Sequence, residues 1–146
     1  MFIYSLIYTL IFPIIFFRSI YKSIFFGEKL SRNLEKLALS KKSKKSNKII
    51  MIHAVSVGEV MASRKFIEEI KNKFEDYEVL ITCTTQTGSK TIKKIYGTSV
   101  LHQYLPFDHK FFLKKFIAYW QPEITFILET EIWPNLIDVL AKNGKK

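Results

Sequence analysis

The chain has 146 residues, of which 48% are hydrophobic, so it is long enough to build the core of one domain. Its net charge of +10 is concentrated in residues 18–48, which hold ten Lys or Arg and two Glu, whereas the rest of the chain is nearly neutral. A basic block beside an apolar segment suits an anionic membrane surface, so we expect anionic lipids as partners and no nucleic acid.

The first segment, residues 1–26, predicts a membrane-anchoring helix. Residues 1–17 carry no charge, and Arg18 and Lys22 follow them. Because the charges come after the apolar run, the segment does not resemble a cleaved signal peptide, and the rest of the chain is expected on the cytoplasmic side of the inner membrane. A single span, an interfacial helix and a buried core helix all remain open, since a span usually needs about 20 apolar residues and Pro13 can kink or shorten the helix.

Residues 27–47 form a predicted basic linker, which ends in the lysine-rich run 39–47. The folded domain is then expected over residues 48–146. It contains one cysteine, Cys83, inside an apolar run, which predicts a buried thiol in a reducing compartment. The three histidines have no cysteine or second histidine at metal-ligand spacing, so no metal is expected.

Apolar runs and helical periodicity alternate along residues 48–146 and predict the order βαβαβαβα. The expected strands are 49–55, 78–83, 100–105 and 124–128, and the expected helices are 60–74, 89–96, 111–120 and 134–141. This alternation is typical of an α/β fold with a Rossmann-like parallel sheet. Ligands of such sheets bind at the carboxyl ends of the strands, so the loops after each strand are the candidate sites.

The loop after the first strand contains Ser56, Gly58 and Glu59. A carboxylate at this edge can accept a proton from a hydroxyl group, or it can complement the positive end of the following helix. The loop after the second strand, residues 84–89, is rich in hydroxyl groups. It can either bind an anion or provide ordinary N-capping by Thr87 or Ser89.

The later loops carry carboxylates as well. Asp108 follows the third strand, and Glu129 and Glu131 follow the fourth. Glu129 and Glu131 are one residue apart and point to opposite sides of an extended chain, so we expect one in the cleft and one in a capping role. Pro134 suits the first position of a helix. The sequence contains neither a phosphate-binding P-loop nor a dinucleotide-binding glycine motif.

Four segments resemble the 3-deoxy-D-manno-octulosonic acid (Kdo) transferases in order and spacing. They are HAVSVGEV (53–60), TTQTGS (84–89), YLPFD (104–108) and ETEIWPNL (129–136), and the apolar leader is similar too. The resemblance covers essentially the whole chain. It implies the N-terminal, acceptor-binding domain of a GT-B glycosyltransferase, which faces a second, donor-binding domain across a cleft.

The resemblance also implies a reaction. The donor is CMP-Kdo, the acceptor is a lipid A precursor (lipid IVA) at the cytoplasmic face of the inner membrane, and neither a metal nor a cofactor is needed. Glu59 would be the general base of an inverting transfer, and Glu129, in preference to Glu131, would stabilise charge in the transition state. From loop position we expect the following residues to contact the acceptor: Ser56, Gly58, Thr85, Thr87, Gly88 and Ser89.

The family continues beyond the region that ends here at Lys146 into its donor-binding domain. We therefore expect this chain to be inactive alone, as a fragment of a transferase. The alternatives are a non-catalytic, membrane-tethered lipid-binding module, or one half of a split enzyme that needs a separately encoded donor-binding partner. A third alternative, an unrelated Rossmann-like domain, conflicts with the length of the matching motifs.

Overall fold

The computed structural model describes residues 2–25, 27, 31–39, 48–128 and 132–144 of the chain. The described elements follow one another as α1 (Phe2–Phe25), α2 (Ser31–Lys36), β1 (Ile49–His53), α3 (Val57–Ala62), α4 (Arg64–Lys73), β2 (Glu78–Cys83), α5 (Gln86–Tyr96), β3 (Leu101–Tyr104), α6 (Lys110–Trp120), β4 (Ile124–Ile127) and α7 (Pro134–Lys142). They fall into two compact units. One contains α1, α2, α7 and most of α6, and the other contains the sheet with α3, α4 and α5.

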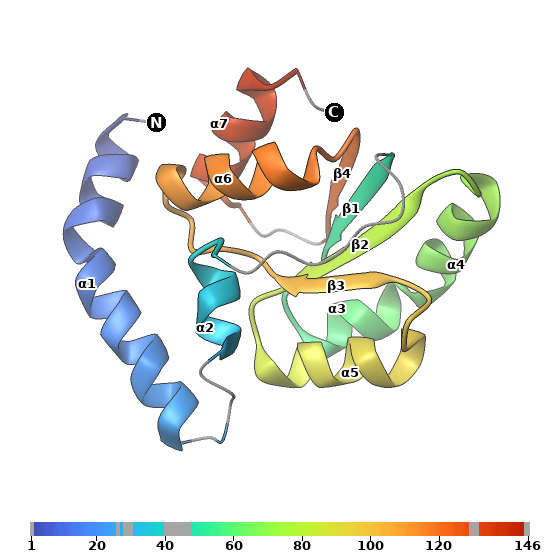
Figure 1. Ribbon diagram of the computed structural model, residues 1–146, viewed down its shortest axis with the longest axis horizontal. Coiled ribbons are helices and arrows are strands. Elements are labelled where there is room, and N and C mark those ends of the chain that lie inside the picture. Colours follow the sequence, from blue (N-terminus) through green and yellow to red (C-terminus); the bar gives the residue numbers. More distant parts are fainter. Residues whose placement is uncertain (1, 26, 28–30, 40–47, 129–131, 145–146) are drawn as a thin grey trace. The chain divides into compact units, whose positions relative to one another are not determined.

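The sheet has four parallel strands in the order β3-β2-β1-β4 (Figure 1). The register places Ile52 of β1 opposite Ile81 of β2 on one side and Phe126 of β4 on the other. The predicted parallel α/β fold is therefore confirmed. The chain leaves β1 toward β2 and β3 and later returns to the other side of β1, so β1 and β4 flank the topological switch point at which such sheets bind ligands.

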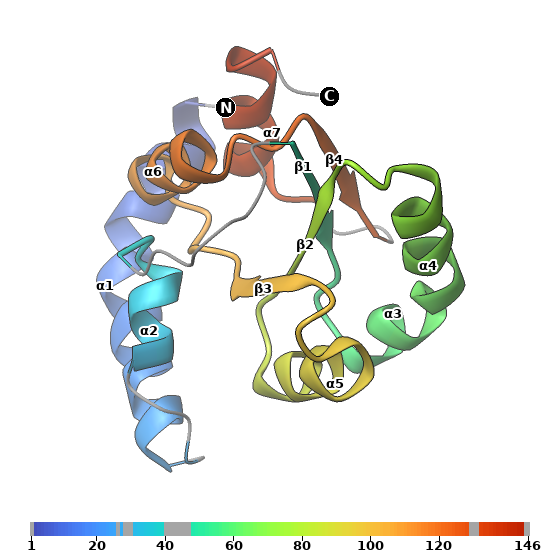
Figure 2. The same cartoon turned by 45° about the vertical axis from the view of Figure 1, so that its right-hand side comes forward.

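A cluster of buried apolar side chains lies on one face of the sheet. Alternate residues of each strand point to the same face, which is why Ile50 and Ile52 of β1 pack with Val79 and Ile81 of β2. Helices α3, α4 and α5 contribute buried side chains to the same cluster and lie on this side of the sheet (Figure 2). Burying one aliphatic side chain of this size stabilises a fold by about 1.5–3 kcal/mol.

Two helix predictions need correction. The predicted helix 60–74 is two helices, α3 and α4, which meet at Ser63. The Ser63 hydroxyl donates to the carbonyl of Val60 at 3.2 Å, a local bond that competes with regular helix geometry. The helix expected from residue 89 begins three residues earlier, because its N-cap is Thr85 rather than Thr87 or Ser89.

The predicted strand 78–83 matches β2, and the other three strand predictions are confirmed in place but are one or two residues too long at their ends. Pro134 occupies the start of α7, as predicted. In the N-terminal segment α1 confirms the predicted long apolar helix, and Pro13 lies inside it without ending it.

Helix α2 lies within the range 27–47 that the sequence assigns to a linker, and its six residues were not predicted to be helical. Most of that range, including residues 40–47, lies outside the described residues. The boundaries 1–26, 27–47 and 48–146 therefore stay a prediction.

Candidate functional site

The loop after β1 is closed by a reciprocal capping arrangement. Ser56 is the N-cap of α3, and its hydroxyl oxygen accepts from the Glu59 N–H at 3.3 Å. In return, the Glu59 carboxylate accepts from the Ser56 hydroxyl at 2.9 Å and from the Val55 N–H at 2.6 Å. This is the capping box expected of Ser-x-x-Glu at a helix start, extended by one residue. Glu59 is only 6% exposed, so the loop fixes its side chain at the carboxyl edge of the sheet.

The loop after β2 is held by Thr85. The Thr85 hydroxyl donates to the Val55 carbonyl at 2.9 Å and accepts from the Gly88 N–H at 3.2 Å, which makes Thr85 the N-cap of α5. A Cβ atom added at Gly88 would lie 2.8 Å from Thr85 Oγ1 and 3.4 Å from the Val55 carbonyl oxygen. Gly88 is therefore required by the close approach of the two loops.

The backbone of Val55 joins these two loops. Its N–H donates to Glu59 and its carbonyl accepts from Thr85, so the carboxylate of one loop and the cap of the other are bonded to the two successive peptide groups that flank the Val55 Cα. Four predicted site residues, Ser56, Glu59, Thr85 and Gly88, are thus brought together. The sequence indicates this contact because both loops directly follow strands that are neighbours in a parallel sheet.

Three other predicted site residues differ in their surroundings. Gly58 and Thr87 are exposed in the first turns of α3 and α5. Ser89 is buried, and its hydroxyl is 2.8 Å from His102 Nε2. Because His102 Nδ1 lies 2.8 Å from the carbonyl oxygen of Ile81, that nitrogen carries the proton and Nε2 accepts from Ser89. The Ser89 hydroxyl is therefore directed into the fold.

His53 lies at the end of β1, directly before the candidate loop, and sequence reasoning gave it no role. It is fully buried, with Nδ1 2.9 Å from the Thr82 hydroxyl oxygen. Burial lowers the pKa of His53 to about 4, while the nearby Glu59 charge opposes this shift. His53 is therefore neutral at pH 7. The signal in the sequence was a histidine within an otherwise apolar strand.

On the β4 side of the site, the structure describes the chain as far as Leu128. The Leu128 N–H donates to the His53 carbonyl at 3.0 Å, so the chain after β4 leaves next to the chain after β1. Glu129 and Glu131 follow at once, but they lie outside the described residues. Within the described part of the chain, no group of three His, Cys, Asp or Glu side chains is placed to hold a metal ion.

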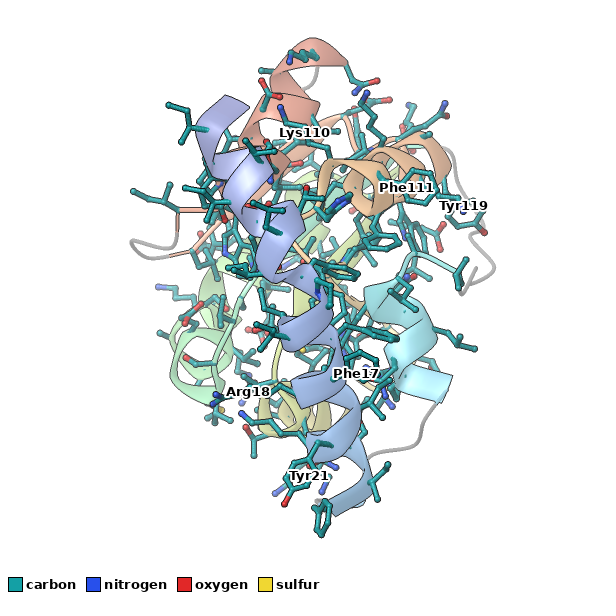
Figure 3. All side chains as sticks on the ribbon, turned by 90° about the vertical axis from the view of Figure 1, so that its left-hand side faces the viewer. Phe17, Arg18, Tyr21, Lys110, Phe111 and Tyr119 are labelled. Carbon is teal, nitrogen blue, oxygen red and sulfur yellow. The ribbon has the colours of Figure 1, made fainter. Side chains whose placement is uncertain are left out.

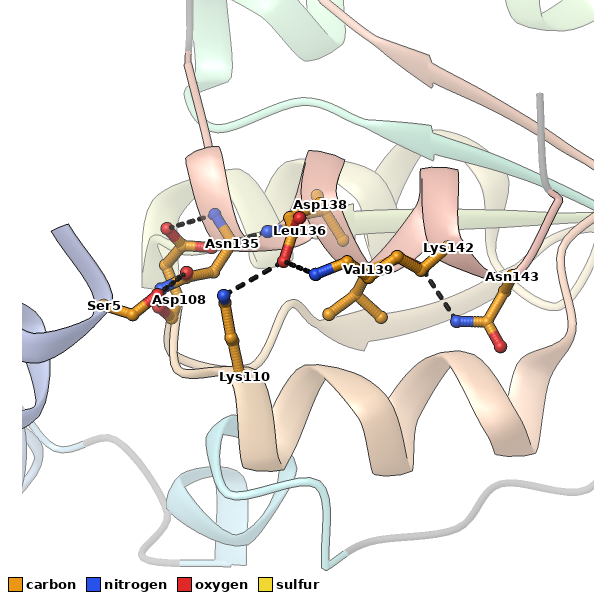
Figure 4. A network of polar contacts seen from close by, with 9 residues as sticks. All are labelled: Ser5, Asp108, Lys110, Asn135, Leu136, Asp138, Val139, Lys142 and Asn143. Carbon is orange, nitrogen blue, oxygen red and sulfur yellow. Dashed lines mark hydrogen bonds and ion pairs between the residues drawn. The ribbon is translucent and has the colours of Figure 1, made fainter. Parts of the chain in front are cut away.

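Asp108 and Asn135, which belong to the other two matching segments, meet in the unit that contains α1. Asp108 is buried, and its carboxylate accepts from the N–H groups of Asn135 at 3.2 Å and Leu136 at 2.9 Å (Figure 4). The side chain of Asn135 donates back to the Asp108 carbonyl at 2.6 Å. Asp108 thus caps the first turn of α7, whose own N-cap, Trp133, makes no side-chain cap hydrogen bond. Burial raises the pKa of Asp108, and these hydrogen bonds oppose that rise.

The strand order and the helices between the strands define a Rossmann-like α/β domain. Comparison with known proteins identifies its kind, because the family model of 3-deoxy-D-manno-octulosonic-acid transferase (kdotransferase) matches residues 31–146. The chain belongs to the Kdo transferase family and corresponds to its N-terminal domain.

Individual relatives agree with this assignment. A 3-deoxy-D-manno-octulosonic acid transferase of Haemophilus influenzae is 42% identical over 91 residues, which make up 62% of this chain and 21% of the relative. One from Rickettsia bellii is 33% identical over 115 residues, or 79% of this chain and 28% of the relative. A probable mitochondrial one from Arabidopsis thaliana is 38% identical over 96 residues, or 66% of this chain and 21% of the relative. The chain thus spans between 21% and 28% of the length of these relatives.

Proposed function

We propose that this chain is the acceptor-binding half of an inverting Kdo transferase and carries its general base, Glu59. In the complete reaction, Kdo passes from CMP-Kdo to a hydroxyl group of a lipid A precursor. The observation that carries this proposal is the Glu59 carboxylate, which is held by the loop after β1 at the switch point of a Kdo transferase domain.

The hydrogen bonds of Glu59 are compatible with this role. Each carboxylate oxygen accepts one hydrogen bond, from Val55 or from Ser56, and a carboxylate oxygen can accept two. Each oxygen therefore keeps one acceptor position, and either can accept from a sugar hydroxyl. As the hydroxyl oxygen forms its bond to the anomeric carbon and CMP departs with the electrons of the broken bond, the proton passes to Glu59.

The neighbouring loops would contact the acceptor. Gly58 and Thr87 are exposed at the start of α3 and α5, and the N-terminus of α5 suits a phosphate or sugar oxygen. We also propose that the acceptor lies beside Ser56, Thr85 and Gly88, which in addition hold the two loops together. Ser89 contributes mainly by fixing the start of α5, because its hydroxyl is bonded to His102.

Glu129 is the proposed stabiliser of charge in the transition state, and Glu131 is the less favoured candidate. Both follow β4, which pairs with β1 and therefore ends at the same edge as Glu59. Glu129→Gln should reduce transfer more than Glu131→Gln. The donor would bind to a second, donor-binding domain, and α1 would hold the enzyme at the cytoplasmic face of the inner membrane.

The proposal is tested by measuring Kdo transfer from CMP-Kdo to lipid IVA. The samples are this chain alone, this chain with the donor-binding half of a relative, and the same pair with Glu59→Gln. We expect transfer only with the second half, and a loss of about 10²- to 10⁴-fold on removal of the base.

Glu68→Gln is the matched control, because Glu68 is a half-exposed glutamate of α4 whose partner is Arg64. It should leave transfer unchanged. Far-UV circular dichroism of both variants establishes that they are folded. Equal transfer by the folded Glu59→Gln pair would show that Glu59 is a capping residue only.

A further inference from the structure

Helix α1 has two faces that differ in chemistry. An outer stripe of large apolar residues repeats at alternating steps of four and three, from Ile3 through Ile7, Leu10, Ile14 and Phe17 to Ile24, and each of these side chains is between 53% and 72% exposed. The inner stripe is less exposed and carries most of the polar side chains of the helix. Residues at this spacing lie on one side of a helix, so the outer stripe is a continuous apolar surface.

The inner stripe is bonded to the rest of its unit. The Tyr4 hydroxyl donates to the Asp108 carboxylate at 2.9 Å, and the Tyr8 hydroxyl accepts from the Asp108 N–H at 3.2 Å. Ser5 donates to the Asn135 side chain at 2.5 Å. Further along, the Phe12 ring lies 5.5 Å from that of Phe107 and 5.4 Å from that of Phe112.

The far end of the helix is attached to α2. The side chain of Asn33 donates to the Ser23 hydroxyl at 3.0 Å, and the Ser19 hydroxyl donates to the side-chain oxygen Oδ1 of Asn33 at 3.2 Å. Polar contacts therefore hold both ends of α1, and aromatic contacts hold its middle. A helix that crossed a bilayer would have to give up these contacts and place the same polar groups in hydrocarbon, where an unsatisfied polar group is costly.

Basic and aromatic residues surround the outer stripe. Arg18 and Lys22 are exposed on α1, and Phe17, Arg18 and Tyr21 lie along the helix in the view of Figure 3. Phe111 of α6 is also exposed, and Lys115 Nζ lies 5.1 Å from the centre of its ring. Figure 3 shows both Phe111 and α1. Apolar and aromatic side chains bordered by cations are typical of a surface that enters the headgroup region of anionic lipid.

We infer that α1 lies in the plane of an anionic membrane surface, with its outer stripe in the lipid and its inner stripe bonded to the segments around Asp108 and Asn33. Helix α1 is long and apolar enough to cross a membrane. In this arrangement it stays in one leaflet. The inference deepens the membrane location in the proposed function, and its test needs no transfer activity.

A second copy of the chain is the alternative occupant of the outer stripe, because alternating steps of three and four are also typical of coiled coils. Two observations favour lipid. Self-association would bring Arg18 and Lys22 of two strongly basic chains together, whereas anionic lipid attracts them. Phe111 of α6, in the same unit, is also an exposed aromatic side chain that lies outside the seam of a single helix.

The depth of α1 in a bilayer distinguishes these arrangements. Single-cysteine variants Ile3→Cys, Ile14→Cys and Ile24→Cys are labelled with an environment-sensitive fluorophore, and their depth is measured with lipid-borne quenchers. The vesicles contain phosphatidylcholine and phosphatidylglycerol. Cys83 is buried, so the unsubstituted chain serves as the control for unwanted labelling.

We expect the three labels at the same shallow depth. A spanning helix rises about 1.5 Å per residue, so residue 14 would lie roughly 16 Å deeper than residue 3. Such a gradient would overturn the inference. Labels that stay in water while the chain forms cross-linked dimers would overturn it in favour of a second copy.

Two further arms test the chemistry of the surface. Binding to phosphatidylcholine alone should be at least about tenfold weaker than binding to the anionic vesicles. Leu10→Glu should release the chain from anionic vesicles, whereas Met61→Glu, which places the same charge at an exposed apolar position of α3, should not. Equal loss for both variants would contradict a specific role for the outer stripe.

Discussion

Gly88→Ala tests the contact that joins the two loops of the candidate site. Gly88 is in the first turn of α5, and alanine is a better helix former than glycine by up to about 1 kcal/mol. Helix propensity alone therefore predicts a more stable protein. The structure predicts the opposite, because the new Cβ atom would lie 2.8 Å from Thr85 Oγ1 and the hydroxyl would have to move.

The size of the effect follows from the bonds of Thr85. Moving its hydroxyl removes the N-cap of α5, which contributes about 0.5–2 kcal/mol, and the bond to the Val55 carbonyl, which contributes about 1 kcal/mol. After subtraction of the propensity gain, Gly88→Ala should destabilise the chain by about 1 kcal/mol. In a Thr85→Ala background the oxygen is gone, and the same substitution should be neutral or stabilising.

Urea unfolding followed by far-UV circular dichroism measures both changes, and their difference is the coupling free energy of the pair. Gly58→Ala is the matched control. Its Cβ would meet only Ser56 Oγ at 3.7 Å, an ordinary contact, so it should not destabilise. The argument fails if Gly88→Ala stabilises the otherwise unchanged chain, or if it has the same effect in both backgrounds.

Two further substitutions probe buried titratable groups. The pKa of His53 is about 4 in the folded state, below the ordinary value of 6.5, so the folded chain binds fewer protons and its stability should fall as the pH drops from about 6.5 toward 4. The loss should reach about 2 kcal/mol at pH 5, and His53→Asn should flatten this pH dependence in urea titrations. Asp108→Asn replaces one of the two carboxylate oxygens, which accept from Tyr4 and from the first turn of α7, by an NH2 donor, and should destabilise by about 1–3 kcal/mol. The exposed Asp76→Asn should not, and equal urea midpoints would contradict the capping role.

The order of the elements and the parallel sheet could be predicted because each strand is a short apolar run and each helix after it has an amphipathic period. The ends of the elements were less predictable, because they depend on individual side chains. The hydroxyl of Ser63 divides one expected helix into two, and Thr85 rather than Thr87 caps α5 because its side chain also reaches the carbonyl of Val55.

The contacts within the site were predictable only in part. The meeting of the loops that contain Glu59 and Thr85 follows from the position of both loops after adjacent strands. The capping of α7 by Asp108 does not, since the two partners are 27 and 28 residues apart and no local pattern links them. The polar stripe of α1 is visible in the sequence as Ser5, Tyr8 and Ser19 at helical spacing, but their partners Asn135, Asp108 and Asn33 are distant in the sequence and no local pattern links them.

The two interpretations of Glu59 offered by the sequence, helix cap and general base, support each other in the structure. A base that must accept a proton from a sugar hydroxyl has to be held at a fixed position before the substrate arrives, and the bonds from Val55 and Ser56 hold the carboxylate in this way. The same bonds lead through Val55 to Thr85 and thus to the start of α5. Substitutions that loosen this connection, such as Gly88→Ala, should therefore reduce transfer by the reconstituted enzyme even though Glu59 itself is unchanged.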